Sequence, residues 1–409
     1  MPDLVVPLVF AFVYLGMIVG RFPRLALDRT GVALLGAIAL LATGRIEVAE
    51  AWNAVDVPTI CLLFGLMVVS AQFRLGGAYT AITHHVAAAE LSPARLLAVL
   101  IGVVGLLSAL LANDIVCLAI APLLVEACAR RGLNPKPFLL GLACAANIGS
   151  AATLIGNPQN MLIGQVLGMS FGGYLLDGGV PALLGLVALW WILQRLSRGH
   201  WHAVLPVPTV EAVTFNPWQS VKAVGILIAL VGGFLFSPIP REILALVAAG
   251  LILTSRRMHT RHMLGLVDWQ LLVLFVSLFV VNHAVQATSQ MDRVMAGLSG
   301  AGLDVTRPAG LFVTSAVLSN VVSNVPAVML LLPAATHPLA GQVLALSSTL
   351  AGNLFLVGSI ANIIVVDQAA RLDVRIDWRE HARIGVPVTL VTLAIAAVWL
   401  GIRIWLVAG

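Results

Sequence analysis

Charged side chains are scarce in this chain of 409 residues, because Asp, Glu, Lys and Arg together make up 10% of it. A soluble protein of this length needs far more charge to coat its surface, so the composition excludes two or three soluble domains. Lysine is rarest, with Lys136 and Lys222 as the only two. The net charge of +5 therefore rests on arginines in short clusters between apolar runs, and this distribution does not favour a nucleic-acid partner.

Cysteine and the common catalytic motifs are also rare or missing. The four cysteines (Cys61, Cys117, Cys128 and Cys144) show no C-x-x-C spacing, so we interpret them as small buried hydrophobes. The sequence contains no G-x-x-x-x-G-K-[ST] or H-E-x-x-H motif. It therefore indicates neither a primary pump nor a membrane enzyme, and it predicts no organic cofactor and no metal centre. The N-terminal MPDLVV lacks a basic signal region, so we expect the first helix to be retained.

Long apolar runs recur along the whole chain instead. Hydrophobic residues make up 60% of it, and the mean hydropathy is +1.02. A bilayer-spanning helix needs about 20 mostly apolar residues, and the runs predict an all-α polytopic membrane protein with about 10–12 segments, some of them incomplete. We expect it in a bacterial inner membrane.

The basic residues predict an orientation. Lys and Arg concentrate in cytoplasmic loops, and here they cluster in segments 130–136, 195–222 and 371–383. Threading the chain with its N-terminus outside leaves only a few arginines on the outer side. We therefore expect a periplasmic N-terminus.

A polar pair, Asn113–Asp114, joins two apolar arms at 94–112 and 115–128. Arginines flank both outer ends of the arms, so we expect a re-entrant hairpin with its tip near mid-membrane. The segment SALLANDI (108–115) matches SAVLSNVV (315–322), and the same charge pattern opens that second hairpin to the outside. Two copies of one unit in opposite orientation are typical of secondary transporters; chance similarity between apolar strings is the alternative.

The expected boundaries of these inverted-topology repeats follow from the polar stretches. The first repeat covers residues 1–196, with a re-entrant hairpin at 94–128 and a broken helix at 138–168; a cytoplasmic linker covers 197–217; and the second repeat covers 218–409, with a re-entrant hairpin at 309–336 and a broken helix at 340–370.

Glycine, proline and asparagine interrupt both broken helices, as ANIGSAATLIGNPQN at 146–160 and AGNLFLVGSIAN at 351–362. Glycine is conformationally permissive and proline lacks an N–H, so we expect interruptions at Gly149, Pro158, Pro326 and Gly358. The first part of the broken helix at 138–168 should end near 154–156. Unpaired backbone groups cost several kcal/mol each in hydrocarbon, so such interruptions persist only where they line a cavity.

These interruptions predict one shared pocket at the bilayer midplane. Helix N-termini there attract anions, and carbonyl ends coordinate Na⁺ or polar groups. The expected substrate- or ion-binding residues are Asn113, Asp114, Asn147, Thr153, Gly156, Asn157, Asn160, Asn320, Ser323, Asn324, Asn353, Ser359 and Asn362. We match Asn147 with Asn353, and Asn157 with Asn362. The alternative is that these amides only join helices by hydrogen bonds.

Asp114 is the one carboxylate that this threading places deep in the membrane. Leaving water disfavours the charged form of an acid, and intramembrane acids often mark ion pathways. We therefore interpret Asp114 as the coupling group for H⁺ or Na⁺, with Asn113 and Asn157 as further Na⁺ ligands. A protonated cap of the arm that begins at Ile115 is the alternative.

The segments LANDIVCLAIAPLL, LACAANIGSAATLIGNPQNMLIG, LSNVVSNVPAVMLLLP and AGNLFLVGSIANIIVVDQA, in this order, resemble the ion transporter superfamily. That family includes arsenite permeases, NhaD-type Na⁺/H⁺ antiporters, citrate transporters and divalent anion:sodium symporters. The resemblance covers nearly the whole chain and is closest to the arsenite-permease branch. It implies a scaffold domain and a transport domain, with substrate held between two re-entrant hairpins and two unwound helices.

The hairpin tips favour one branch of this family. The symporter branch carries Ser-Asn-Thr at both tips, whereas this chain has Ala112-Asn113-Asp114 and Ser319-Asn320-Val321. The asparagines carry over and the threonines do not, which argues against a two-sodium dicarboxylate symporter. Arsenite permeases show a similar Asn-Asp, which favours proton-coupled movement of a small oxyanion or neutral hydroxide species.

The expected function is secondary active transport, by alternating access, of a small inorganic or organic anion such as an arsenite-like species, coupled to H⁺ or Na⁺. A Na⁺/H⁺ antiporter of the NhaD type, a dicarboxylate or citrate symporter, and a channel are the alternatives. The resemblance also raises two partners, because members of the family are often homodimers and arsenite permeases accept a separate ATPase subunit.

Overall fold

The computed structural model describes residues 4–20, 27–203, 206–208, 210, 213–255, 259–288, 297, 300 and 303–408. Among these residues the regular structure is helical, and a single isolated bridge joins Leu133 to His202. Six described helices are long and apolar enough to cross a membrane, namely α4 (Val57–Leu75), α6 (Pro93–Leu110), α10 (Phe171–Leu196), α11 (Pro217–Phe236), α14 (Trp269–Gln286) and α20 (Trp378–Ala408). The predicted all-α polytopic fold is confirmed.

The two halves of the chain begin with helices in the same order. The first half starts with α1 (Val5–Val19), α2 (Arg29–Ala42), the short α3 (Val48–Asn53), α4 and the surface helix α5 (Ala78–Ala88); the second starts with α11, α12 (Arg241–Leu253), the short α13 (Thr260–Leu264) and α14. Asp56 and Asp268 cap α4 and α14 alike, accepting from the backbone N–H of Thr59 at 2.8 Å and of Leu271 at 2.9 Å. Such caps satisfy otherwise unpaired helical N–H groups, and the equivalent placement reflects the internal repeat.

A helical hairpin and a broken helix follow in each half. The first half has α6 and α7 (Asn113–Arg130), then α8 (Pro135–Ser150) and α9 (Pro158–Val166); the second has α16 (Pro308–Val322) and α17 (Asn324–Leu331), the 3₁₀ turn η1 (Leu332–Ala334), then α18 (Ala340–Ala351), the 3₁₀ turn η2 (Leu356–Gly358) and α19 (Ile360–Ala370). The long helices α10 and α20 complete the halves.

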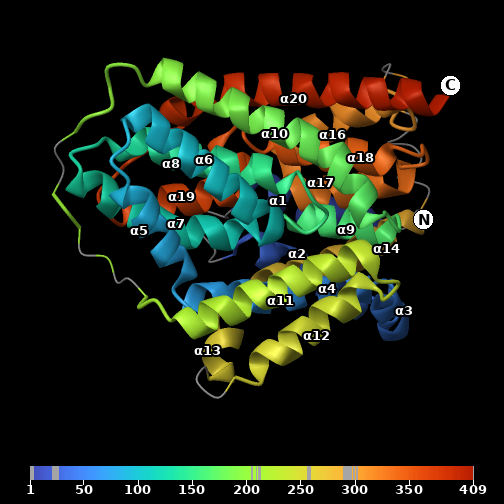
Figure 1. Cartoon of the computed structure of the whole chain (residues 1–409). Helices are drawn as coiled ribbons and strands as arrows, with labels where there is room; N and C mark the ends of the chain where they lie inside the picture. Colours follow the sequence, from blue (N-terminus) through green and yellow to red (C-terminus); the bar gives the residue numbers. More distant parts are fainter. Residues whose placement is uncertain are drawn as a thin grey trace.

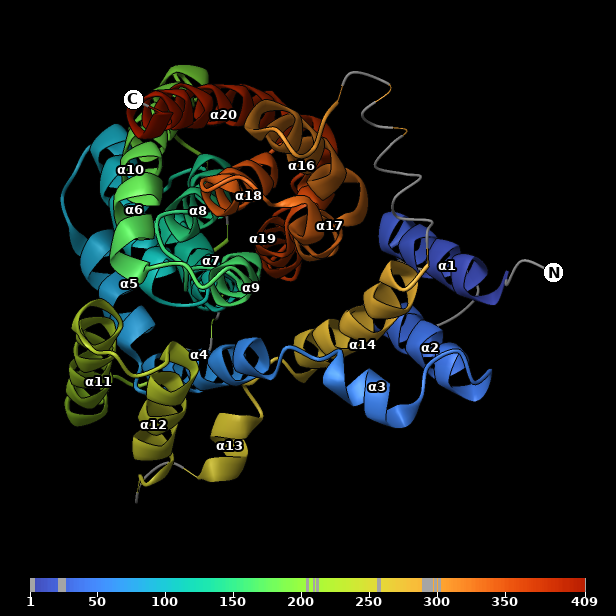
Figure 2. The same ribbon diagram turned by 90° about the vertical axis from the view of Figure 1, so that its right-hand side faces the viewer.

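The helices form two layers, which Figure 2 shows end-on. The scaffold layer consists of α1, α2, α4, α11, α12 and α14, and the bundle beside it consists of α6–α10 and α16–α20. In the scaffold layer α4 packs on α12 and α14 packs on α2, so that each contact joins one half of the chain to the other. In the bundle α10 packs on α20 in the same way. Both layers are therefore built from both halves.

The two halves run in opposite directions. In Figure 1 both chain termini lie at the right-hand end of the molecule, whereas α13 and the segment that joins α10 to α11 lie at the left. We call these the terminus end and the linker end. Because α1 starts at the terminus end and α11 starts at the linker end, the halves have inverted topology.

The helix interruptions predicted at Gly149 and Pro326 are wrong, because both residues lie inside helices. Helix α8 ends at Ser150 rather than near 154–156. The Ser150 carbonyl accepts from the side-chain amides of Asn157 (3.3 Å) and Asn160 (3.4 Å), which cap the helix there. Gly149 lies inside the last turn of α8. Pro326 lies in the first turn of α17, where its missing N–H would have no helical partner.

The helix starts also correct the residue matches between the repeats. Asn113 begins α7 and Asn324 begins α17, so Asn324 rather than Asn320 is the structural counterpart of Asn113. Asn157 and Ser359 are the N-caps of α9 and α19. Counting from these caps matches Asn160, not Asn157, with Asn362. The sequence alignment slipped because apolar strings tolerate small offsets.

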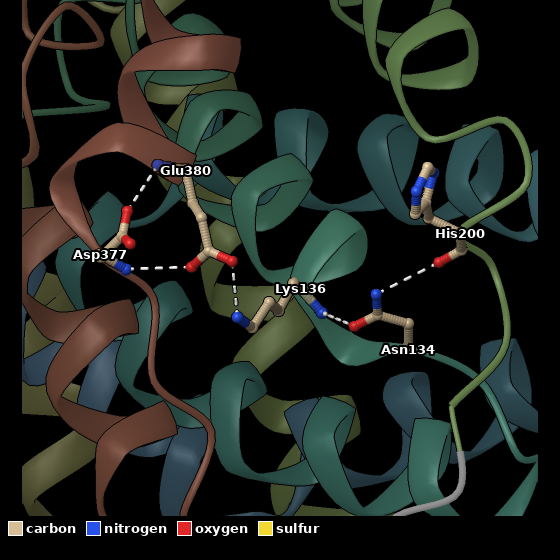
Figure 3. A network of polar contacts seen from close by, with 5 residues as sticks. All are labelled: Asn134, Lys136, His200, Asp377 and Glu380. Carbon is tan, nitrogen blue, oxygen red and sulfur yellow. Dashed lines mark hydrogen bonds and ion pairs between the residues drawn. The ribbon is translucent and has the colours of Figure 1, made fainter.

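A polar network ties α8 to α20 at the linker end (Figure 3). Lys136 Nζ lies 2.6 Å from Glu380 Oε1, and Glu380 Oε2 accepts from the backbone N–H of Asp377 at 3.0 Å. Asp377 Oδ1 in turn accepts from the Glu380 N–H at 2.7 Å, which is a reciprocal helix cap. Asn134 connects the start of α8 to the carbonyl of His200 at 3.2 Å.

Glu380→Ala should destabilise the protein more than Lys136→Met. The ion pair is more than a third exposed on both sides, so its loss should cost about 1 kcal/mol or less. Glu380→Ala also removes one arm of the cap, which adds about 1 kcal/mol. Thermal unfolding of the purified variants measures the difference, and an equal or larger effect of Lys136→Met would contradict this account.

Candidate functional site

A cavity of about 30 Å³ lies where the two hairpin tips meet the two helix breaks. We call it the central cavity. It is lined by the expected residues Asn113, Asp114, Asn147, Asn157, Pro158, Ser323, Asn324 and Ser359, and also by Gln159, Leu271, Val325 and Ile360. It has room for about one or two water-sized groups. All lining residues except Leu271 of α14 belong to the bundle.

Four helices begin at the central cavity. Their first residues, Asn113 of α7, Pro158 of α9, Asn324 of α17 and Ile360 of α19, all line it. Each helix N-terminus carries about half a positive charge, and caps such as Asn157 and Ser359 accept only some of the first-turn N–H groups. The described lining residues include no Lys or Arg, so backbone dipoles supply the positive potential. This setting favours an anion or an electron-rich oxygen atom.

Asn147 joins both halves of the site. Its Nδ2 donates to Asn353 Oδ1 at 2.9 Å and to Asn362 Oδ1 at 3.1 Å. Its Oδ1 accepts from Ser359 Oγ at 2.8 Å and from Asn113 Nδ2 at 3.4 Å. The side chain thus connects α8 to the first hairpin tip and to the opposite helix break.

A second cluster surrounds Thr349 of α18, which the sequence analysis missed. Thr349 Oγ1 accepts from Asn157 Nδ2 at 3.3 Å and from Gln159 Nε2 at 3.1 Å, and it donates to Asn160 Oδ1 at 3.3 Å. Asn157 Nδ2 also donates to Ser150 Oγ at 2.9 Å. The only sequence signal for Thr349 was the hydroxyl run 347–349 inside an apolar helix.

The remaining expected residues fasten the tips to the breaks without lining the cavity. Thr153 Oγ1 donates to the carbonyl of Ala109 at 2.5 Å, and Asn160 Nδ2 donates to the Thr153 carbonyl at 3.0 Å. The Gly156 carbonyl accepts from the Asn113 N–H at 3.3 Å. Asn320 Nδ2 donates to the Ala351 carbonyl at 3.1 Å. Gly358 lies in η2, within the second break. The structure therefore brings all thirteen expected binding residues into one region, as cavity lining or as its hydrogen-bonded support.

Two amide oxygens, one from each hairpin tip, are left without a partner. Within the described part of the chain, Asn113 Oδ1 and Asn324 Oδ1 are buried and accept no hydrogen bond. Ser323, which precedes Asn324 and also lines the cavity, has a φ of 79° and a ψ of 160°, which are unusual for any residue but glycine. The tips therefore offer acceptors to a donor or a cation.

Asp114 is half-buried and is the only carboxylate among the described lining residues of the central cavity, whereas the acids Glu126 and Asp177 are more deeply buried. Asp177 of α10 is 3% exposed, forms a 2.6 Å ion pair with Arg403 of α20, and accepts from Gln342 Nε2 at 3.1 Å. The sequence analysis missed this pair because its partners lie far apart along the chain.

Comparison with known proteins identifies the family. The family profile described as citrate transporter matches residues 12–346. The chain belongs to the citrate transporter family. An uncharacterized transporter of Mycobacterium tuberculosis (strain H37Rv) is 30% identical to it over 92% of this chain and 94% of the relative. The silicon efflux transporter LSI3 of Oryza sativa subsp. japonica is 29% identical over 93% of both chains.

Two further similarities agree with this assignment. The inner membrane protein YbiR of Escherichia coli (strain K12) is 29% identical over 81% of this chain and 85% of its own length. The crystal structure of the YdaH transporter of Alcanivorax borkumensis matches 98% of this chain and 97% of that chain, with a TM-score of 0.60 and 14% identity. The sequence relatives place this citrate transporter family member among multi-pass membrane transporters, and YdaH shares its fold.

Proposed function

We propose that this family member is a secondary active transporter that carries a small oxyanion or oxyacid across the inner membrane by alternating access, coupled to H⁺ or Na⁺. The observation that carries the proposal is the convergence of four helix N-termini on a small cavity lined by amides and hydroxyls. Backbone N–H groups and amides bind oxygen atoms of either a neutral or an anionic solute. One relative is named for silicon efflux, which suits an oxyacid.

Citrate suits this cavity less well, although the family is described as citrate transporter. A tricarboxylate is far larger than the one or two water-sized groups for which the central cavity has room. It would also meet the Asp114 carboxylate with no Lys or Arg among the described lining residues to offset the repulsion. The proposed substrate is therefore a compact species such as arsenite or silicic acid.

Asp114 supplies a route to coupling. It is the second residue of α7 and lines the cavity, where an ionised carboxylate offsets the positive potential of the helix N-termini. Neutralising Asp114 with a proton, or pairing it with Na⁺, restores that potential and favours the bound oxyanion. Ion binding and substrate binding at this site are then mutually favourable.

Asp114→Asn should abolish uphill accumulation but not downhill flux. The amide has the shape of a protonated carboxyl group and does not titrate, so an imposed pH or Na⁺ gradient should no longer concentrate arsenite in proteoliposomes. Downhill exchange should stay within about tenfold of the wild-type rate, because the shape of the site is kept. A tenfold change in rate corresponds to about 1.4 kcal/mol in the barrier.

Glu126→Gln is the matched control, because it removes a carboxylate at the other end of α7, where Glu126 pairs with Arg130 at 2.7 Å. Its coupling should be unchanged. Retained gradient-driven accumulation in Asp114→Asn would overturn the coupling role. If neither a pH gradient nor a Na⁺ gradient drives accumulation in the wild-type protein, secondary active transport is overturned and a channel is favoured.

A Na⁺/H⁺ antiporter is the second candidate, favoured by the unpartnered Asn113 Oδ1 and Asn324 Oδ1 near the Asp114 carboxylate. Oxygen atoms of this kind can coordinate Na⁺. In the same vesicles, an antiporter would exchange Na⁺ for H⁺ without any oxyanion present, whereas the proposed transporter would not.

A further inference from the structure

A larger cavity, of about 200 Å³, is lined by the last residues of α14 and by residues of the bundle, and α14 ends toward the terminus end (Figure 1). We call it the outer cavity. Helices α9, α14 and α17 line it with Leu162, Asn282, His283, Gln286 and Met329. The same three helices line the central cavity with residues nearer the linker end of α14 and nearer the starts of α9 and α17. The two cavities therefore follow one another along a single interface.

The distance between them is short. Leu271 of α14 lines the central cavity and Asn282 of the same helix lines the outer one. At 1.5 Å per residue these positions are about 16 Å apart along the helix axis. Leu162 and Met329 lie along α9 and α17 beyond the first residues of those helices, which line the central cavity.

Asn282 presents an unsatisfied donor. The residue is 5% exposed, and its Oδ1 accepts from the Tyr14 hydroxyl at 2.9 Å. Within the described residues its Nδ2 has no hydrogen-bond partner. Leaving a buried donor unpaired costs about 1–3 kcal/mol, and an oxygen atom of a solute in the outer cavity would remove that cost.

Tyr14 fixes the orientation of this amide. Because its hydroxyl donates to Asn282 Oδ1, the Nδ2 atom takes the other position. The Tyr14 hydroxyl also lies 3.5 Å from the Pro326 carbonyl in α17, so the contact spans the boundary between the scaffold layer and the bundle.

The rest of the cavity suits a small polar solute. His283 Nε2 lies 3.2 Å from Glu50 Oε1, and both side chains are about half exposed. The exposed Gln286 adds an amide, while Leu162 and Met329 form apolar walls. The outer cavity thus has an exposed polar mouth and, among its described lining residues, one buried donor without a partner.

We infer that the outer cavity is a second binding site for a small oxygen-bearing solute, on the route from the central cavity to the terminus end. Asn282 binds the solute, and Tyr14 is a positioning residue. The inference takes the class of solute from the proposed function, but it concerns the outer cavity rather than the central cavity.

Binding stoichiometry tests it. The full-length protein in lipid nanodiscs is dialysed against silicic acid, a neutral oxyacid, or inorganic phosphate, an oxyanion, and the bound silicon or phosphorus is counted. The wild-type protein should bind two equivalents of one probe, whereas Asn282→Leu and the central-cavity variant Asn324→Ala should each bind one. Ser348→Ala, which removes a buried hydroxyl of α18 that lines neither cavity, should keep two.

The outcomes separate the two proposals. One equivalent in both the wild-type protein and Asn282→Leu would overturn the outer site and leave the proposed function intact. No binding of either probe to the wild-type protein would overturn the solute class, and both proposals with it. Tyr14→Phe should weaken the second equivalent about tenfold and leave the first unchanged; two unchanged equivalents, or an equal loss of both, would overturn the positioning role. This variant also provides the test if Asn282→Leu does not fold.

Discussion

Replacing Asn147 by leucine should abolish measurable transport, with a loss of at least about 100-fold, which corresponds to about 2.7 kcal/mol. The change leaves four buried polar partners, on Asn113, Asn353, Ser359 and Asn362, without the hydrogen bonds that Asn147 makes. Each unsatisfied group costs about 1–3 kcal/mol. The first hairpin tip and the second helix break should then separate. Uptake by proteoliposomes and thermal unfolding measure the two consequences.

Ser348→Ala is the control for this prediction. Ser348 is fully buried in α18, one residue from Thr349, but its Oγ donates to the Leu344 carbonyl of its own helix at 2.6 Å. Removing it leaves the contacts between the halves intact, so transport should stay near the wild-type rate. If the Asn147→Leu protein still transports within tenfold of the wild-type rate, the hydrogen bonds of Asn147 do not hold the site together.

Gly149→Ala should prevent accumulation of folded protein. A Cβ atom at this position would lie 2.3 Å from the carbonyl oxygen and 2.5 Å from the Cα atom of Gly105 in α6. These are backbone atoms, so α6 and α8 would have to move apart, and overpacking of this kind costs about 1–3 kcal/mol or more. Small residues commonly allow such close approach of membrane helices. The yield of monodisperse protein in detergent and its thermal midpoint are the measurements.

Gly102→Ala provides the matched control on α6. A Cβ atom there would meet nothing within 4 Å, and alanine is the better helix former by roughly 1 kcal/mol. Its yield should equal or exceed that of the wild-type protein. If Gly149→Ala and Gly102→Ala behaved alike, the tight contact between α6 and α8 would not limit folding.

The sequence was most informative where a single residue type has one local role. Asn157 before Pro158 predicts a helix start, since asparagine caps well and proline fits the first position, and α9 begins at Pro158 with Asn157 as its cap. The hairpin arms likewise follow from apolar runs with a polar centre. Their ends were located within a few residues of the helices observed.

Contacts between distant segments could not be predicted in the same way. The contacts of Tyr14 with Asn282, of Asp177 with Arg403, and of Asn147 with three partners in the second half each depend on packing of helices from both halves. Apolar periodicity shows that a helix is buried but not which neighbour buries it. The slip from Asn324 to Asn320 has the same origin, because only the position of the turn between α16 and α17 distinguishes them.

The left-handed backbone of Ser323 has an energetic consequence for the second hairpin. A non-glycine residue in this region costs about 1–3 kcal/mol relative to a relaxed conformation. Glycine would avoid this cost. Serine instead places a hydroxyl at the cavity and leaves the backbone of the turn strained. Any rearrangement that frees this turn recovers the stored energy, and it displaces Asn324 and Val325 as it does so. Relaxation of this turn would therefore release energy where Ser323, Asn324 and Val325 form part of the cavity wall.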